Sequence, residues 1–336
     1  RGPFQSDGYD GAHSSAQRNM ETGSEFVENE HGNLRVILLL ILSVSMVSSA
    51  SILIRFSTSD PLVIVFWRTL YGSLLMGSLA LLRGDRVAFT GKQVRGTWSW
   101  LVLIGIVLCL HFATWFTSLF MTTVAASVVL VNTSPIMTAL LSTTILSEHL
   151  SKQSWGGILI AIIGAGFLAW TDLQAQGAGA LTGDLLALLS ALFLAMYFIG
   201  GRRYTKGIPI TVYTSIIYFV AAMATLALCI VLRVNVMVFE LREVVIFLAL
   251  AVFPTALGHS VNNYLLTLVP AYVVSVAVLG EPIGATILAM IFLTEFPSAL
   301  TLIGFGVILL GIGLVLIDIA IKERNKRSTL NHTNRS

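Results

Sequence analysis

Residues 274–295 read V-S-V-A-V-L-G-E-P-I-G-A-T-I-L-A-M-I-F-L-T-E, an apolar run of membrane-spanning length that contains Glu281 and Pro282. An ionised side chain near the centre of a bilayer costs at least ~2.5 to 3.5 kcal/mol, so Glu281 must be neutralised, hydrated or paired. Pro282 frees a backbone carbonyl one turn earlier, and freed backbone is tolerated at that depth only where protein or water satisfies it. The stretch therefore predicts a helix beside an internal cavity, with Glu281 as a candidate functional group.

The composition of the whole chain is that of a membrane protein with several spans. Hydrophobic residues make up 56% of the sequence and charged residues only 11%, and the mean hydropathy is +0.86. Soluble proteins average about 45 to 50% apolar and about 25% charged residues. The composition argues against a soluble multidomain protein. The sequence also has no interleaved basic and aromatic surface that would indicate nucleic acid as a partner.

Ten apolar runs are each of about the length, ~20 residues, that a helix needs to cross a hydrocarbon core of about 30 Å. The third and fourth runs, and the eighth and ninth, are separated by only a few residues and predict tight antiparallel hairpins. The predicted fold class is an all-α polytopic membrane protein with ten transmembrane helices. The runs cover residues 34–55, 62–82, 98–120, 123–146, 154–171, 183–200, 210–232, 244–266, 269–294 and 299–320.

Basic residues gather in alternate loops and predict the orientation of the helices. Lysine and arginine follow the second, fourth, sixth and tenth runs, whereas the opposite loops mix arginine with aspartate and glutamate. Because short cytoplasmic loops are enriched in Lys and Arg, we expect both termini in the cytoplasm, with the plasma membrane as the location. Residues 1–33 are polar and lack a signal-peptide core, so we expect a disordered cytoplasmic segment that is in part an artificial extension.

An internal repeat relates the two halves of the chain. Pro135 is followed thirteen residues later by Glu148, and Pro282 is followed thirteen residues later by Glu295, so both pairs are offset by 147 positions. Each half of the ten-helix pattern holds an odd number of helices, so the second copy inserts upside down, as in many secondary transporters. The same offset pairs Gly157 with Gly304, Gly164 with Gly311, and Gly166 with Gly313.

The repeat sets the predicted domain boundaries. We expect a first repeat over residues 34–171 and an inverted second repeat over residues 183–321, followed by a basic cytoplasmic tail at residues 322–336. The paired glycines lie on one face of the fifth and tenth helices and predict close backbone packing there.

These features resemble the drug/metabolite transporter superfamily, EamA type. The resemblance covers about residues 34–321 and implies two inverted repeats around a central cavity, with the fifth and tenth helices at the periphery. It also implies transport of small metabolites, often export of amino acids or related compounds. It rests on the ten helices, the two Pro-x12-Glu spacings, Gly280-Glu281-Pro282, Phe66-Trp67-Arg68 and the paired glycines.

Arg68 in the second run is a candidate site residue. Its guanidinium stays charged, so it needs an anionic partner, carbonyls, water or a route to the interface. Recognition of a substrate carboxylate is one interpretation, and a structural role as a snorkelling or tethering side chain is the other. Trp67 and Trp115 are candidate aromatic walls of the cavity.

Polar side chains in the third and eighth runs recur at helical spacing and so share a face of each helix. The cost of turning an imidazole toward lipid favours a cavity position for both histidines. For the hydroxyls and amides, hydrogen bonding between helices is the alternative. The candidates are His111, Trp115 and Ser118 in the third run, and His259, Asn262 and Asn263 in the eighth.

The two prolines mark predicted breaks in helices of the two repeats. Asn132 and Ser134 precede Pro135 and are candidates to bond the backbone that this proline frees. Glu281 precedes Pro282 but has no acidic counterpart in the first repeat, where Ser134 is its nearest positional equivalent. This asymmetry favours a role for Glu281 in selecting the substrate or an ion.

Three other acidic residues lie at helix ends. For Glu148 and Glu295, local pairing at a loop and a role as gate residues both stay open. Asp318 is expected to be hydrated near the cytoplasmic end of the last helix.

Together these residues predict a secondary transporter that works by alternating access around a midplane cavity. Opposite charges at Arg68 and Glu281 suggest a zwitterionic substrate such as an amino acid, with proton coupling through Glu281 as a further expectation. An integral-membrane enzyme, such as a lipid-linked transferase, is the alternative; the metalloprotease and phosphate-loop motifs are missing. We expect a small-molecule substrate and the lipid bilayer as partners, no cofactor and no metal, while monomer or homodimer stays open.

Overall fold

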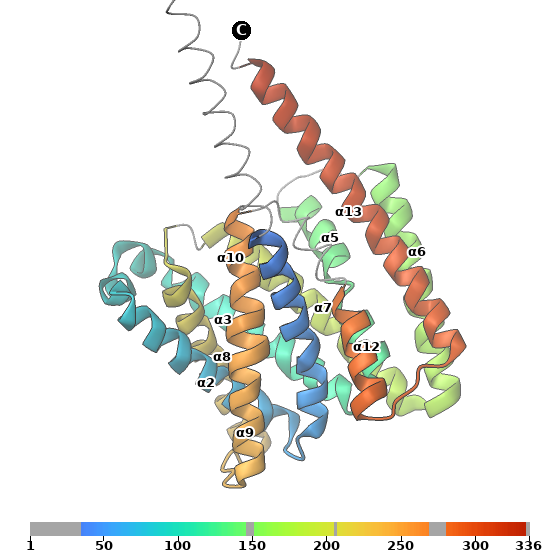
Figure 1. The fold of residues 1–336 in the computed structure, drawn as a ribbon, viewed down its shortest axis with the longest axis horizontal. Coiled ribbons are helices and arrows are strands. Elements are labelled where there is room, and N and C mark those ends of the chain that lie inside the picture. The colour runs from blue at the N-terminus through green and yellow to red at the C-terminus, as the bar shows by residue number, and fades with distance from the viewer. Residues whose placement is uncertain (1–34, 146–150, 205–206, 269–279, 334–336) are drawn as a thin grey trace, which may run out of the picture.

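The structure, a computed structural model, describes residues 35–145, 151–204, 207–268 and 280–333 (Figure 1). Seven helices in these ranges are long and apolar enough to cross a membrane, and three shorter apolar helices accompany them. The predicted all-α polytopic fold is confirmed. In chain order the elements are a first helix Arg35–Phe56, α2 Pro61–Leu82, η1 Asp85–Thr90, α3 Lys92–Leu119, α4 Val124–Val131, α5 Ser134–Ile145, α6 Lys152–Gln176, α7 Ala178–Tyr204, α8 Ile210–Leu232, α9 Leu241–Leu250, η2 Ala251–His259, α10 Ser260–Leu268, α12 Gly280–Phe292 and α13 Ala299–Thr333.

The first helix belongs to the first repeat but lies between two helices of the second (Figure 1). Ser43 donates to the side chain of Asn262 on α10 at 2.6 Å. One turn further along, Ser48 approaches the backbone oxygen of Glu281 on α12 at 3.4 Å. The two halves of the chain are therefore interleaved around this helix.

The fourth predicted span is two helices in the structure. The Thr123 side chain accepts a hydrogen bond from Ala126 N at 3.1 Å and caps the start of α4. α4 ends at Val131, and α5 starts at Ser134. Pro135 follows directly, at a helical position where its missing N–H costs little. The break that the sequence predicts at Pro135 is thus placed just before the proline.

The eighth span is continuous but changes its helical type in the middle. α9 passes into the π-helix η2, which contains Pro254, and then into α10. The side chain of Thr255 bonds the carbonyl of Leu250, five residues earlier, at 2.8 Å. Proline removes a regular backbone bond, and the wider turn accommodates the change. The apolar run at residues 244–266 predicts an ordinary helix, so the π-helical turn differs from that expectation.

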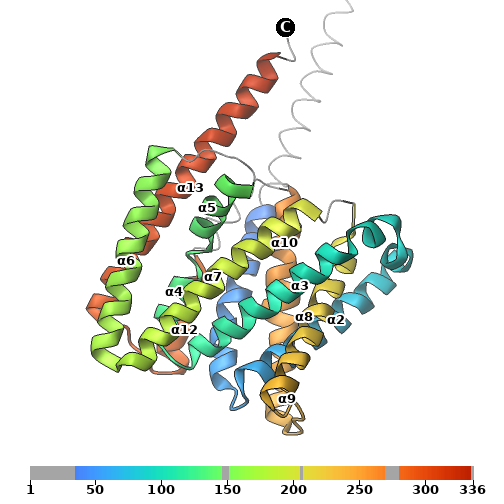
Figure 2. The same cartoon turned by 180° about the vertical axis from the view of Figure 1, so that it is seen from behind.

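α6 and α13 form an outer pair, seen beside the rest of the bundle in Figure 2. An ideal Cβ on Gly311 would lie 2.6 Å from Ala161 N and 2.6 Å from Gly157 O. On Gly164 it would lie 2.9 Å from the Ile308 backbone nitrogen. The two backbones therefore approach as closely as the glycine pattern predicts.

The last helix is longer than its apolar run, and one expectation about it is wrong. α13 runs on to Thr333, so residues 322–333 continue the helix beyond the predicted end at residue 320. Asp318 is only 7% exposed and accepts a hydrogen bond from Ser154 Oγ on α6 at 2.6 Å. The carboxylate joins the two helices of the outer pair and is not hydrated as expected.

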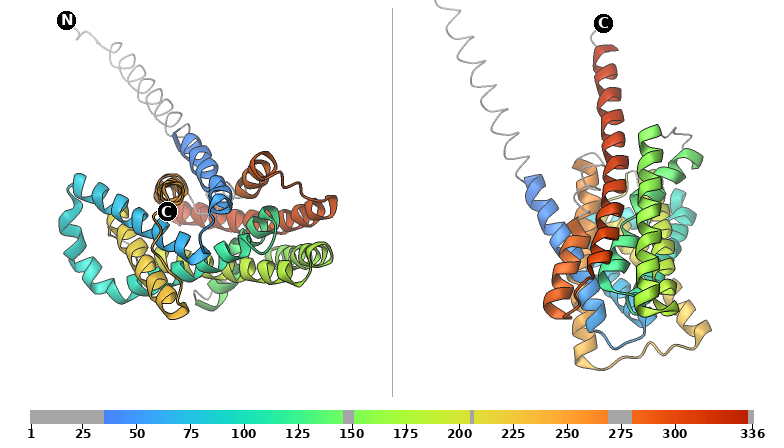
Figure 3. Two further views of the ribbon diagram at one scale, coloured as in Figure 1. Left: turned by 90° about the horizontal axis from the view of Figure 1, so that it is seen from below. Right: turned by 90° about the vertical axis from the view of Figure 1, so that its right-hand side faces the viewer.

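Most helices run between two opposite ends of the bundle, as the side view in Figure 3 shows. The first helix begins and α13 ends at the same end of the bundle (Figure 1). We call the opposite end, which carries the turns 57–60, 120–123 and 293–298, the loop end. The basic residues Arg83, Arg86, Lys92 and Arg203 lie at helix ends away from it.

Candidate functional site

Arg68 lies on α2 and is completely buried. Its Nε donates to Thr255 Oγ1 on η2 at 2.8 Å. Its guanidinium carbon lies 4.3 Å from the ring centroid of Phe112 and 5.3 Å from that of Phe116, both on α3. Nη1 and Nη2 have no hydrogen-bond partner among the described residues. Among the described residues, this buried cation therefore has an outer edge without a hydrogen-bond acceptor.

Glu281 lies in the first turn of α12, in the second repeat. Its Oε2 accepts a hydrogen bond from Asn132 Nδ2 at 3.4 Å, and Asn132 ends α4 in the first repeat. The two broken helices therefore meet at these polar side chains.

Arg68 and Glu281 face the same region from different repeats. They are close enough to interact electrostatically. They do not form an ion pair. In the described part of the chain, only Arg55 and Glu295 have charged atoms within 4.0 Å of each other. Opposite charges held near each other but apart are suited to binding a molecule that carries both charges.

Two of the predicted aromatic and imidazole residues stack beside this pair of charges. His111 and Trp115 lie with ring centroids 6.1 Å apart and nearly parallel planes. His111 Nδ1 is 2.8 Å from Ser190 Oγ on α7, and Ser190 Oγ donates to His111 O at 2.9 Å. The indole nitrogen of Trp115 is buried without a hydrogen-bond partner among the described residues.

His259 approaches from the second repeat, at the end of η2. Its ring packs edge-on against Phe112, with centroids 6.1 Å apart, and it lies close enough to His111 and Arg68 to interact electrostatically. The structure therefore brings together both histidines, Arg68 and Phe112.

Other predicted candidates serve contacts away from this cluster. Trp67 Nε1 donates to Val236 O at 2.9 Å, near the loop end. Ser118 shares a 2.5 Å contact with Ser127 Oγ across the α3–α4 hairpin. Asn262 is bonded to Ser43, and the backbone oxygen of Ser134 accepts from Thr138 at 2.9 Å. These contacts fit the interpretation of hydrogen bonding between and within helices.

Asn263 approaches α7. Its side chain is within hydrogen-bonding reach of the Tyr197 hydroxyl on α7, which also interacts with Tyr213 on α8. Both tyrosines are buried.

Sequence reasoning missed three residues of the cluster: Thr255, Tyr218 and Ser190. A threonine or serine inside an apolar helix usually bonds its own backbone, so its type and position carry no signal of function. Tyr218 is 1% exposed, and its ring lies 3.4 Å from the position that a Cβ on Gly72 would take. Gly72 lies four residues after Arg68 on α2 and therefore on the same face of the helix. This small residue beside Arg68 is the one hint in the sequence that a large side chain packs there.

The candidate gate residue Glu295 lies at the loop end and joins three segments. Its Oε1 accepts from Arg55 Nη2 at 3.2 Å, and its Oε2 accepts from Val124 N at the start of α4 at 2.9 Å. Arg55 Nη1 donates to Leu119 O at 2.7 Å. Glu148, its counterpart in the repeat, lies outside the described residues.

A second carboxylate holds the turn after the first helix. Glu243 on α9 is 1% exposed and accepts hydrogen bonds from the Ser57 hydroxyl, from Thr58 N at 3.0 Å and from the Ser59 hydroxyl at 2.8 Å.

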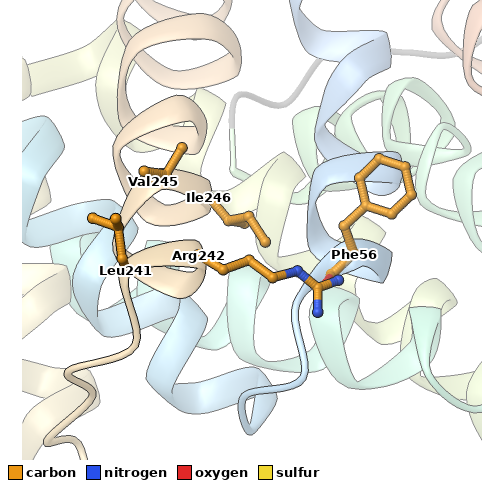
Figure 4. Close-up of a pocket in the computed structure, with 5 residues that line it drawn as sticks. All are labelled: Phe56, Leu241, Arg242, Val245 and Ile246. Atoms are coloured by element: carbon orange, nitrogen blue, oxygen red, sulfur yellow. The ribbon is translucent and has the colours of Figure 1, made fainter.

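A surface pocket of about 530 Å³ opens beside this turn (Figure 4). It is lined by the end of the first helix and the first turns of α9, and Arg242 Nη2 donates to Phe56 O across it at 2.7 Å. The residues that line this pocket include neither Arg68 nor Glu281, and most of them are apolar. The pocket is formed by Phe56, Leu241, Arg242, Val245 and Ile246.

Comparison with known proteins gives concordant matches. A family model described as the EamA-like transporter family matches residues 34–170 and again residues 181–317. The uncharacterized transporter YdfC of Bacillus subtilis (strain 168) is 27% identical over 195 residues, which cover 56% of this chain and 61% of that protein. A solved structure described only as a crystal structure of a protein has a TM-score of 0.59 at 19% identity, covering 84% of this chain and 96% of the other. That likeness supports the fold alone.

Proposed function

The chain belongs to the EamA-like transporter family, and we propose that it carries small zwitterionic metabolites, such as amino acids, across the membrane by alternating access. The observation that carries this proposal is a pair of opposite charges, the buried Arg68 from the first repeat and the half-buried Glu281 from the second, which lie near each other without pairing. Transporters built from inverted repeats bind their substrates where the repeats meet.

Each charge suits one end of such a substrate. The free edge of the Arg68 guanidinium matches a carboxylate, because two parallel N–H groups can bind its two oxygens. Glu281, at the break of α12, suits a protonated amine. His111, Trp115 and Phe112 supply the adjoining surface. Family membership also favours transport over the alternative of a lipid-linked transferase.

Glu281 is also our candidate for proton coupling. Its carboxylate can take up a proton, and its approach to Asn132 joins the broken helices of the two repeats. Protonation would weaken its hold on a cationic amine. Binding of a proton and binding of the amine would then exclude each other, which is the requirement for exchange of one against the other.

The test is flux through the purified protein in liposomes. Tritiated L-amino acids are offered one at a time, with and without a pH gradient. We expect uptake of at least one of them above that of empty liposomes, and greater uptake with the gradient. If none of the twenty is transported, the proposed substrate class is wrong.

Glu281→Gln tests the coupling role. This substitution keeps the shape but removes both the titratable group and the charge proposed to bind the amine, so we expect uptake to fall and to lose its dependence on the pH gradient. The matched control is Glu240→Gln, the same change at an exposed position next to α9, which should leave the gradient effect intact. Full gradient-driven uptake by Glu281→Gln would rule out coupling through this residue.

A further inference from the structure

The Arg68 guanidinium is oriented by its neighbours. Its Nε donates to Thr255 Oγ1, and Phe112 and Phe116 lie within cation–π distance on α3. A guanidinium presents five N–H groups in one plane. With Nε bound, the edge formed by Nη1 and Nη2 is the one that has no partner among the described residues. The direction of this edge is therefore set by Thr255.

Thr255 can hold Arg68 because of the π-helical turn that carries it. The Thr255 hydroxyl donates to Leu250 O, five residues earlier, at 2.8 Å. That bond uses its hydrogen and leaves an oxygen lone pair to accept from Arg68. Ser260 Oγ, five residues later, approaches Thr255 O at 3.3 Å. Turns of this type are rare and frequently occur at functional sites.

Two more buried donors near Arg68 have no hydrogen-bond partner of acceptable geometry among the described residues: Trp115 Nε1 and the Tyr218 hydroxyl. Tyr218 lies beside Ser260 and interacts electrostatically with Arg68. Trp115 packs edge-on against Phe116, with centroids 5.5 Å apart. Buried donors without acceptors cost free energy unless a ligand satisfies them. Arg68, Trp115 and Tyr218 together offer the donors that an acidic group needs.

We propose that Thr255 is a positioning residue that aims the Nη1–Nη2 edge of Arg68 at the carboxylate of the transported molecule, with Trp115 and Tyr218 as additional donors. This inference rests on the proposed function and adds to it the determinant of selectivity. A substrate analogue with an amide in place of the carboxylate presents one acceptor and an NH₂ group, which meets donors instead of accepting from them. The site therefore selects carboxylates over their amides.

The experiment compares two substitutions of Thr255 in liposomes, using the tritiated L-amino acid with the largest flux in the panel. Thr255→Val keeps the shape and removes the hydroxyl, and Thr255→Ser restores it. We expect Thr255→Val to raise KM about tenfold, equivalent to about 1.4 kcal/mol, with little change in maximal rate. Thr255→Ser should stay within about twofold of the unchanged protein. Thr225→Val is the matched control, since Thr225 is equally buried but bonds Ala221 O and contacts Cys109.

Competition by the unlabelled amide of the same amino acid gives a second readout. Against the unchanged protein the amide should compete at least about tenfold less well than the acid, and Thr255→Val should narrow that difference. If Thr255→Val proves unfolded by size-exclusion chromatography, Thr255→Ala and Thr255→Ser carry the same comparison.

The outcomes separate the two proposals. Unchanged KM and unchanged discrimination in Thr255→Val or Thr255→Ala, with flux intact, would overturn the positioning role and leave the proposed function standing. Loss of flux by equal factors in Thr255→Val and Thr225→Val would also overturn it, because a general packing defect would explain both. Absence of amino-acid flux in the unchanged protein would overturn the proposed function, and this inference with it.

Discussion

Placing the charged Arg68 side chain in the membrane interior costs free energy, and its surroundings offset only part of that cost. A cation in the membrane interior costs at least ~2.5 to 3.5 kcal/mol on insertion scales, and Arg68 has no exposed surface. Its one hydrogen bond to Thr255 and its two aromatic neighbours offset part of this cost. The remaining donors make sense if the substrate supplies the other acceptors.

Arg68→Lys should separate charge from geometry at this position. Lysine keeps the positive charge but offers a single ammonium that cannot bond Thr255 and grip both oxygens of a carboxylate in the same way. We expect KM for the transported amino acid to rise by at least about tenfold, measured by initial uptake rates in liposomes.

The control for this change is Arg203→Lys. Arg203 is exposed at the end of α7, 5.6 Å from the ring of Tyr204, so its replacement should leave KM unchanged. An unaltered KM in Arg68→Lys would show that the forked geometry is unimportant and that only the charge matters.

Residues whose type is unusual for a membrane helix could be predicted from the sequence. Arg68, Glu281, His111 and His259 stand out because each is costly in lipid, and the structure brings them together. Thr255 could not be predicted, since its role depends on a turn that only the folded chain reveals. Trp67 is a predicted candidate that lies outside the cluster. Arg68, the next residue, is in the cluster, but the Trp67 indole donates to Val236 O in the segment before α9.

At the scale of elements, the repeat carried most of the predictive power. The all-helical fold follows from hydropathy, and the close backbone packing at α6 and α13 follows from the spacing of glycines, whereas their peripheral position was implied by the family resemblance. The π-helix η2 does not, because Pro254 is equally compatible with a kink, a break or a wide turn. The extension of α13 to Thr333 was missed because its last residues are polar, and hydropathy alone cannot separate a polar helix from a tail.

The outer pair offers a clean test of helix packing. In Gly311→Ala the new methyl group would lie 2.6 Å from Ala161 N and Gly157 O, so α6 and α13 must separate. We expect a loss of stability of about 1 to 3 kcal/mol, seen as a lower melting temperature in detergent.

Gly313→Ala, two residues along the same helix, is the control for this substitution. Nothing lies within 4 Å of its added Cβ, and alanine is favoured over glycine inside helices by about 1 kcal/mol. Its melting temperature should stay the same or rise. Equal effects of the two substitutions would contradict the close approach of the helices.

At the scale of the whole molecule, the loop end is held together by polar contacts between distant segments. Glu295 joins Arg55 to the start of α4, and Glu243 holds the turn 57–59. We propose that the Glu295 contacts keep this end closed in the conformation described and must break for it to open during alternating access. The side chains of the ion pair are 27% and 25% exposed, so solvent screens it and its contribution is modest.

Replacing Glu295 with alanine should therefore shift the balance toward an open loop end by about 1 kcal/mol, which is about a fivefold change in population. The reporter is Ser118→Cys, a buried position on α3 near this end, in a chain whose Cys109 and Cys229 are replaced by alanine. We expect a membrane-impermeant thiol reagent to label it several-fold faster when Glu295→Ala is added. Glu240→Ala, an exposed carboxylate at the same end, should leave the rate unchanged. An unchanged labelling rate in folded Glu295→Ala protein would show that these contacts do not control opening, and would leave Glu295 as a local tie between loops.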